Sequence, residues 1–276
     1  MSARRTQLVL VAGAIALTGV LYLLPRKTSE EKAAIQSQSR QSTYTFEGLL
    51  ADAKSQVKRQ ELDPINQLED KLQQAPQDTA VLGELGRSWD RLGFPAISSG
   101  YFRRIAEAAP GENTWINAAY RYFDAFKLSG DSTLQSMMVQ QAIESYGKVL
   151  AINPDNLDAK TDLGICYAEG TTTPMQGIML LREVVEKNPG HANAQFNLGI
   201  LSVRSGQYDK ALERFSKVLE IDPKRTLARF MIGRVYAQQG QQEKALAVLE
   251  QVKKESSDPQ LLKEADQLIN QIQNNH

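Results

Sequence analysis

The sequence has very little cysteine and histidine. Its 276 residues include one cysteine, Cys166, and two histidines, of which His276 is the last residue. A single cysteine excludes an internal disulfide framework and a cysteine-based metal cage. So few histidines also argue against histidine-based or metal-dependent catalysis. We therefore expect a protein that is not an enzyme, with no catalytic residues, no metal and no cofactor, and with Cys166 as a buried thiol.

The chain also lacks an excess of charge of either sign. It carries 32 basic and 32 acidic side chains, so its formal net charge is zero. A balanced chain has no global field that would attract a nucleic acid or an acidic substrate. No glycine-rich phosphate loop is present either. We therefore expect no nucleic acid and no small-molecule substrate among its partners.

Long apolar runs are absent except near the amino terminus. Residues 8–24 contain no charged side chain and follow a short polar tail, residues 1–7. A helix needs about 17–25 apolar residues to span a bilayer, so this run is at the lower limit for a transmembrane anchor. A cleaved signal peptide would place small residues directly after the apolar run, whereas Tyr22 to Pro25 occupy that zone. We predict an uncleaved anchor over residues 8–24, with a cleaved signal peptide or a buried helix as alternatives.

The orientation of this anchor follows from its flanks. Arg4 and Arg5 favour an inside amino terminus, while Arg26 and Lys27 stand on the other side. A short leading tail followed by a large folded domain favours export of that domain. We therefore predict a single-pass membrane protein with an exported repeat domain, and a cytosolic orientation stays open.

Two segments connect the anchor to the main domain. Residues 25–45 are rich in Ser, Gln and Thr and predict a flexible tether. Residues 46–76 have apolar side chains at helical spacing, and Asp63-Pro64 is typical of a helix start. This segment is either a pair of lead-in helices or a degenerate first repeat.

Prolines recur at a nearly constant interval through the rest of the chain. These prolines are Pro76, Pro110, Pro154, Pro189 and Pro223. Three of the four intervals between them are close to 34 residues, and one is about ten residues longer. Since proline cannot continue a helix, each one marks the end of a unit. The extra length falls between the two helices of that unit, around residues 123–141, which contain a Ser-Gly-Asp turn signal. It predicts two elongated helices with a protruding tip, which is either a tolerated insertion or a contact for a partner.

Small residues recur with the same period as the prolines. Residues 192–223 carry a Leu-Gly pair, a turn glycine, an alanine and a phenylalanine; the next unit repeats this pattern with Ile232-Gly233, Gly240, Ala245 and Leu249. These features resemble the tetratricopeptide repeat, a family of helix-turn-helix units that bind other proteins. The resemblance implies an all-α, right-handed solenoid of five repeats over residues 77–259. Residues 260–276 would then form a C-terminal capping helix, as solenoids require.

The resemblance also implies a functional surface. In tetratricopeptide proteins the first helix of each repeat lines a concave groove that holds a peptide or a partner helix. The residues that this implies for the groove are Arg87, Arg91, Asn117, Tyr120, Ile165, Asn193, Phe196, Asn197, Ile200, Phe230 and Arg234. Asparagine amides can both donate to and accept from a peptide backbone, which suits Asn117 and Asn197 to that role.

The layout of anchor, tether and repeats resembles bacterial inner-membrane proteins that assist envelope protein biogenesis, secretion or complex assembly. The resemblance therefore implies a membrane-tethered scaffold that binds a protein or peptide, with a periplasmic repeat domain. A cytosol-facing import or chaperone-type receptor with the same fold is the alternative, and an enzyme is a remote one. Fold-level analogy cannot name the partner.

Overall fold

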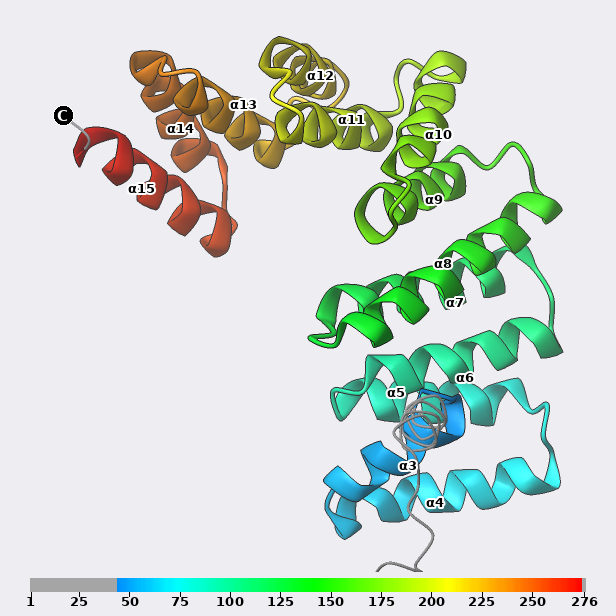
Figure 1. Cartoon of the computed structure of the whole chain (residues 1–276). Helices are drawn as coiled ribbons and strands as arrows, with labels where there is room; N and C mark the ends of the chain where they lie inside the picture. The colour runs from blue at the N-terminus through cyan, green and yellow to red at the C-terminus, as the bar shows by residue number, and fades with distance from the viewer. Residues whose placement is uncertain (1–43, 275–276) are drawn as a thin grey trace, which may run out of the picture. The chain divides into compact units, whose positions relative to one another are not determined.

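A computed structural model describes residues 44–274 of the chain, and every regular element within them is a helix, from α3 to α15 (Figure 1). The predicted tail, the predicted anchor and residues 25–43 of the predicted tether lie outside the described residues. The chain divides into two units, residues 1–55 and residues 56–276. The all-α class predicted from the sequence is confirmed for the described part of the chain, while the right-handed sense of the solenoid stays a prediction.

The described part of the first unit, residues 44–55, consists almost wholly of one short helix, α3 (Phe46–Gln56), whose last residue is assigned to the second unit. It begins where Thr45 ends the predicted tether. The Thr45 hydroxyl oxygen accepts a hydrogen bond of 3.1 Å from the backbone N–H of Gly48. This bond satisfies one of the backbone donors that a helix start leaves without a partner.

Helix α4 (Arg59–Gln74) corrects one boundary that the sequence predicts. Asp63-Pro64 does not start this helix, because α4 already begins at Arg59 and Pro64 lies inside it. Pro64 is the sixth residue of α4, so its missing N–H removes the intrahelical bond that this position would otherwise donate to the backbone oxygen of Gln60. Ile65 and Leu72 then point to one side and are buried.

Five helix pairs follow α4, and each helix contacts the next along the chain. The pairs are α5 (Thr79–Arg91) with α6 (Pro95–Ala108), α7 (Glu112–Leu128) with α8 (Ser132–Ile152), α9 (Leu157–Gly170) with α10 (Pro174–Lys187), α11 (Ala192–Arg204) with α12 (Tyr208–Ile221), and α13 (Thr226–Gln238) with α14 (Gln242–Glu255). Helix α15 (Pro259–Asn274) comes last and packs on both α14 and α13. It covers the apolar side of the last pair through Leu261, Ala265 and Ile269, which are buried.

Glycine allows the two helices of a pair to approach closely. A Cβ atom added to Gly199 of α11 would lie 2.7 Å from the ring of Phe215 on α12. In the next pair, a Cβ atom at Gly233 would lie 2.9 Å from the Leu249 side chain. Real Cβ atoms essentially never approach neighbours so closely, so a larger side chain at either position would force the facing side chain to shift. The recurring Leu-Gly and Ile-Gly pairs of the sequence therefore serve helix packing.

The second pair is longer than the others, as the sequence predicts. Helix α7 has 17 residues and α8 has 21, whereas the remaining pairs use helices of 13 or 14 residues. The turn between them is Ser129 to Asp131. The Asp131 carboxylate accepts a hydrogen bond of 2.8 Å from the N–H of Leu134 and so caps α8. The added residues extend both helices, and the longer pair remains packed on its neighbours.

No helix within residues 44–274 is long and apolar enough to cross a bilayer. This finding corrects the predicted localisation, a single-pass membrane protein with an exported repeat domain, because the described helices supply no membrane span. The run that carried that prediction, residues 8–24, lies outside the described residues.

Candidate functional site

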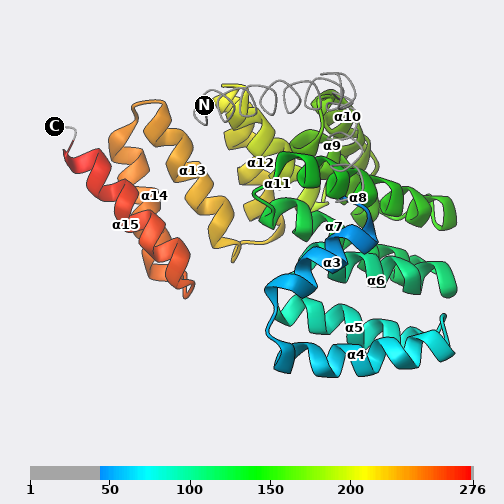
Figure 2. The ribbon, with the colours of Figure 1, turned by 60° about the horizontal axis from the view of Figure 1, so that its bottom comes forward.

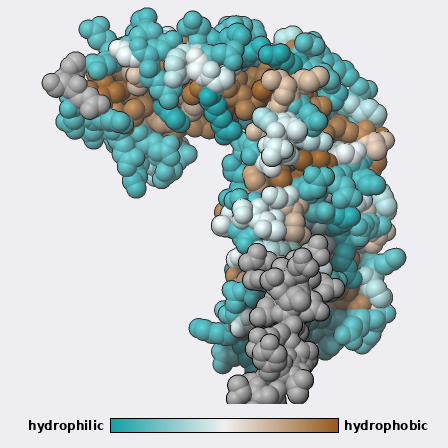
Figure 3. Space-filling model, in the orientation of Figure 1, coloured by the Kyte–Doolittle hydropathy of each residue, from teal (hydrophilic) through white to brown (hydrophobic). Residues whose placement is uncertain are grey.

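The candidate site is the surface formed by the first helices of the five pairs, α5, α7, α9, α11 and α13, which we call the first-helix face. Helix α9 contacts both α7 and α11 directly, although a second helix separates each of these pairs in the sequence. Side chains on neighbouring first helices can therefore meet across the repeats. The space-filling view shows apolar groups between hydrophilic ones over the part of the chain from α11 to α14 (Figure 3).

At the α5–α7 end the central side chain is Arg121, which the sequence does not single out. Its guanidinium forms an ion pair with Asp90 of α5 and lies 3.7 Å from the centre of the Phe102 ring. Its Nε also donates a hydrogen bond of 3.2 Å to Oδ1 of Asn117, a predicted groove residue. Arg121 is four residues after Asn117, so helical spacing places both on one side of α7. Asp90 belongs to another repeat, so no local sequence pattern predicts its ion pair with Arg121.

The other groove residues predicted at this end are exposed. Arg87 and Arg91 lie on the surface of α5, and the Arg91 guanidinium donates a hydrogen bond of 2.9 Å to the Ser88 hydroxyl. Tyr120 is 57% exposed, which is unusual for a large aromatic side chain on a helix. These side chains are available to a ligand without rearrangement of the core.

The middle of the face brings three predicted residues together. Ile165 of α9 and Asn197 and Ile200 of α11 line one small cavity, together with the Glu169 side chain. The Asn197 amide donates 2.8 Å to the backbone oxygen of Asn193 one turn earlier. This contact orients the side chain and leaves its carbonyl oxygen available as an acceptor. Two apolar side chains thus flank one oriented amide.

Glu169 links three repeats on this face. Its carboxylate lies 2.8 Å from the Lys127 ammonium of α7 and 3.4 Å from the Arg204 guanidinium of α11. The Glu169 side chain is only 19% exposed, so water screens these contacts less than it would on an open surface. The network holds the first helices of three successive pairs in register.

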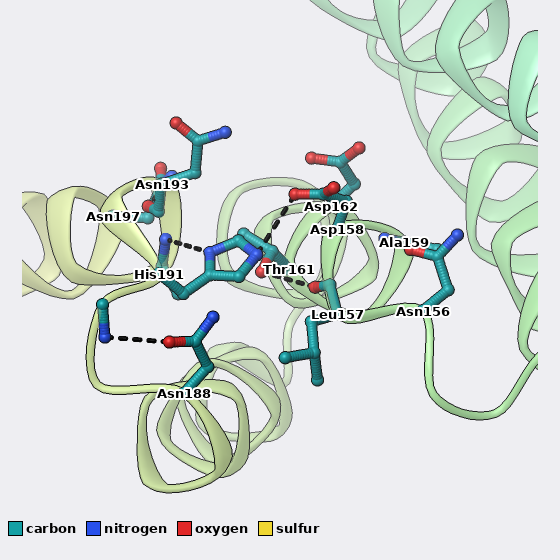
Figure 4. Close-up of polar contacts among 12 residues, drawn as sticks. Asn156, Leu157, Asp158, Ala159, Thr161, Asp162, Asn188, His191, Asn193 and Asn197 are labelled. Carbon is teal, nitrogen blue, oxygen red and sulfur yellow. Dashed lines mark hydrogen bonds and ion pairs between the residues drawn. The ribbon is translucent and has the colours of Figure 1, made fainter.

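His191, at the start of α11, joins α11 to α9 (Figure 4). Its Nδ1 accepts a hydrogen bond of 3.3 Å from the N–H of Ala194, and its Nε2 lies 3.1 Å from a carboxylate oxygen of Asp158. Figure 4 also shows Asp158, Asp162 and Asn193 extending toward the same side of the two helices.

Burial raises the pKa of two groups beneath this part of the face. It raises the pKa of Asp162 to about 6, although the Tyr146 hydroxyl donates a hydrogen bond of 3.2 Å to the carboxylate and partly offsets that effect. Burial also raises the pKa of the Cys166 thiol well above its usual range. Cys166 is fully buried, as the sequence predicts, and belongs to the apolar core. A thiol in this state is a poor nucleophile and a poor metal ligand.

Asn193 and Phe196 meet a residue of the next repeat. The Arg225 guanidinium, which precedes α13, donates a hydrogen bond of 2.9 Å to Oδ1 of Asn193 and lies 4.9 Å from the centre of the Phe196 ring. Phe196 also lies against Phe215 of α12, with ring centres 5.4 Å apart. Asn193 and Phe196 therefore both contact residues of the next repeat or of α12, and they are less available to a ligand than Asn197 or Ile200.

The last two predicted groove residues, Phe230 and Arg234, differ in their burial. Phe230 is 4% exposed and belongs to the core between α12 and α15, so its place on the groove surface has to be corrected. Its side chain contributes to packing and cannot reach a ligand while the core stays intact. Arg234, one turn later on α13, is exposed. Within residues 44–274 no group of three or more His, Cys, Asp or Glu side chains is suited to hold a metal ion.

Comparison with known proteins agrees with this architecture. Residues 180–213 and residues 202–272 match two models described as tetratricopeptide repeat. A curated relative, the tetratricopeptide repeat-containing protein trd-1 of Caenorhabditis elegans, is 27% identical over 120 residues, which is 43% of this chain and 14% of the relative. The match therefore spans about a seventh of that relative's length. Residues 180–272 thus match tetratricopeptide repeat models, as the sequence predicts for this part of the chain.

Two solved structures share the fold at low sequence identity. A tetratricopeptide repeat protein from Parabacteroides merdae superposes with a TM-score of 0.59 and 19% identity, covering 83% of this chain and 86% of that one. A thermophilic TPR protein of Thermus thermophilus gives a TM-score of 0.53 and 18% identity, covering 69% of this chain and 98% of that one. The described helices therefore form an all-helical tetratricopeptide solenoid.

Proposed function

We propose that this chain is a protein-interaction scaffold that binds a peptide or a helix of a partner protein along the first-helix face. In this proposal the five repeats over residues 77–259 form the binding domain, residues 46–76 lead into it, and residues 260–276 close its core. The ligand is a protein segment, and the chain performs no chemistry on it.

The observation that carries the proposal is the arrangement of Ile165, Asn197 and Ile200. They come from two different repeats and line one cavity. Neither isoleucine is fully buried, so both offer apolar surface to a ligand. The oriented amide between them can accept a hydrogen bond from a peptide N–H group. Apolar contacts around a backbone-binding amide suit a peptide better than a small polar metabolite.

The ion pairs around this cavity support the same use. Lys127, Glu169 and Arg204 fix three first helices relative to one another. A face that is already ordered loses less conformational entropy when a ligand binds. The network therefore favours recognition by a surface that changes little on binding.

The test uses the full chain and a library of random twelve-residue peptides displayed on phage. Peptides that the wild-type chain selects would be synthesised with a fluorescent label, and their dissociation constants measured by anisotropy. The variant Ile165→Gln/Ile200→Gln should weaken binding by about tenfold or more, since each lost apolar contact is worth about 1 kcal/mol.

Met179→Gln is the matched control. Met179 is 58% exposed and lies on α10, a second helix, so its loss should leave the affinity unchanged. Circular dichroism would confirm that both variants stay helical. If no peptide is selected, or if Met179→Gln weakens binding as much as the double variant, the proposal is wrong.

A further inference from the structure

A cavity of about 350 Å³ lies at the carboxyl-terminal end of the chain, between α13, the start of α14 and α15. Figure 2 shows these three helices side by side. The volume is near the lower end of the range for ligand pockets, about 300–1,000 Å³. It is separate from the cavity at Ile165 and Ile200, and its lining includes Arg234 of the predicted groove.

The polar lining of this cavity is cationic and rich in amides. The polar side chains are Arg234, Gln238, Gln242 and Gln271. No aspartate or glutamate from the described part of the chain is among the lining residues. Arg234 and Gln238 are four residues apart on α13, so they are neighbours on one side of that helix.

These polar groups lack partners within residues 44–274. The only polar contact of Arg234 is with the sulfur of Met231, at 3.9 Å, and a thioether is a weak acceptor. Nor do the amides of Gln238, Gln242 and Gln271 form a hydrogen bond with any residue that the structure describes. Four donors therefore converge on one space without a protein acceptor.

Two other arginines of the first helices are paired with carboxylates. The Arg121 guanidinium pairs with Asp90, and the Arg204 guanidinium lies 3.4 Å from a Glu169 oxygen. Each of them compensates its charge with a carboxylate from a neighbouring repeat. Arg234 has no such carboxylate within the described residues, so its charge is available to an external anion.

An apolar wall completes the cavity. Ala237, Leu268 and Ile272 line it, and Ile272 belongs to the core cluster on which Leu268 packs. A ligand that fills the space must therefore combine a negative charge with an apolar group and with polar groups that the glutamine amides can bind. A peptide segment with a carboxylate beside an apolar side chain has this combination.

We propose that this cavity binds a carboxylate of the partner peptide, with Arg234 as its counter-ion. The amides of Gln238, Gln242 and Gln271 bind the peptide groups next to that carboxylate, and Leu268 contacts an adjacent apolar side chain. The inference rests on the proposed function and specifies one chemical feature of the ligand. The carboxylate belongs either to an acidic side chain or to the carboxyl terminus of the peptide.

The test repeats the phage selection on the full chain in two formats. In one format the random peptide is internal, and in the other it ends in a free carboxyl terminus. Enrichment of Asp and Glu in the internal format identifies an acidic side chain, whereas enrichment confined to the second format identifies the terminal carboxylate. Either result fits the proposal, and selected peptides without any required carboxylate contradict it.

The decisive variants are Arg234→Glu and Arg234→Lys, measured by anisotropy with the selected peptides. Loss of a charge-assisted contact should weaken binding to Arg234→Glu by about tenfold or more, while Arg234→Lys should retain part of the affinity. Where the carboxylate is a side chain, replacing it with lysine should restore binding to Arg234→Glu. Arg182→Glu, an exposed arginine on α10, a second helix outside the first-helix face, is the control and should bind like the wild type.

The outcomes separate this inference from the proposed function. Peptides that depend on Ile165 and Ile200 but bind Arg234→Glu as tightly as the wild type would overturn the carboxylate site and leave the scaffold proposal standing. If the wild-type chain selects no peptide in either format, both proposals fail. Unchanged circular dichroism of Arg234→Glu would confirm that any loss reflects binding.

Discussion

The hydroxyl group of Tyr146 on α8 donates a hydrogen bond of 3.2 Å to a carboxylate oxygen of Asp162 on α9. The bond joins two repeats beneath the first-helix face. Burial nevertheless dominates at this carboxylate and raises its pKa from the ordinary value of 3.8 to about 6. The folded chain therefore binds a proton at Asp162 more readily than the unfolded chain does.

A raised acid pKa has a defined effect on stability. Between pH 3.8 and about 6 the folded state holds more protons than the unfolded state, so its stability falls as the pH rises through that window. Above this pH window the charged Asp162 lowers the free energy of unfolding by its full amount, and below the window it has no effect. With allowance for solvent screening of a partly exposed group, it amounts to about 1–2 kcal/mol.

Replacement of this carboxyl group should therefore stabilise the protein at neutral pH. Asp162→Asn keeps an oxygen for the Tyr146 hydroxyl and removes the charge. We expect its free energy of unfolding, from urea titration, to exceed that of the wild type at about pH 7.5 by about 1–2 kcal/mol. The difference should vanish near pH 4. Asp155→Asn is the control, because Lys187 lowers the pKa of that exposed carboxyl; an equal gain there would contradict the account.

Gly199 and Gly147 should respond to alanine in opposite directions. A Cβ atom at Gly199 would lie 2.7 Å from the Phe215 ring, whereas nothing lies within 4 Å of one at Gly147 on α8. Gly199→Ala should lower the free energy of unfolding by about 1–3 kcal/mol through overpacking. Gly147→Ala should raise it by about 0.5–1 kcal/mol, since alanine favours a helix interior. Thermal unfolding of both variants is the measurement, and a stable Gly199→Ala chain would disprove the close approach.

His191 should act mainly as a cap for α11. Its Nδ1 accepts from the N–H of Ala194 at 3.3 Å, and its Nε2 lies 3.1 Å from Asp158. His191→Ala should cost about 0.5–2 kcal/mol of stability, while His191→Asn should retain most of it, because asparagine is a good cap. Urea titration at neutral pH distinguishes the two variants. Equal losses would assign the effect to the Asp158 contact and exclude the cap as its cause.

The repeat architecture could be predicted from the sequence because its strongest constraints are local. Gly199 has to be small where α11 meets α12, and prolines such as Pro189 and Pro223 follow the ends of helices. Helix starts are less well encoded. Pro64 is typical of a first turn, yet α4 begins five residues earlier and continues through the proline, so the Asp-Pro pattern does not mark the helix start here.

The candidate site could be predicted only in part, because it depends on helix rotation and on contacts between repeats. Ile165, Asn197 and Ile200 meet at one cavity, whereas Phe230, placed on the same face by its position in a first helix, turns into the core. One residue along a helix rotates a side chain by about 100°. Arg121 was missed because its partner Asp90 lies in another repeat, and no local pattern reveals that pairing.

The most direct test of the scaffold proposal is photocrosslinking with a peptide that the full chain selects. A benzoylphenylalanine placed at position 197 of the first-helix face should crosslink to the peptide, while one at position 216, an exposed site on α12, should not. Mass spectrometry would identify the joined residues. Crosslinking at position 197 alone is the predicted result, and crosslinking at position 216 without any at position 197 would contradict the account.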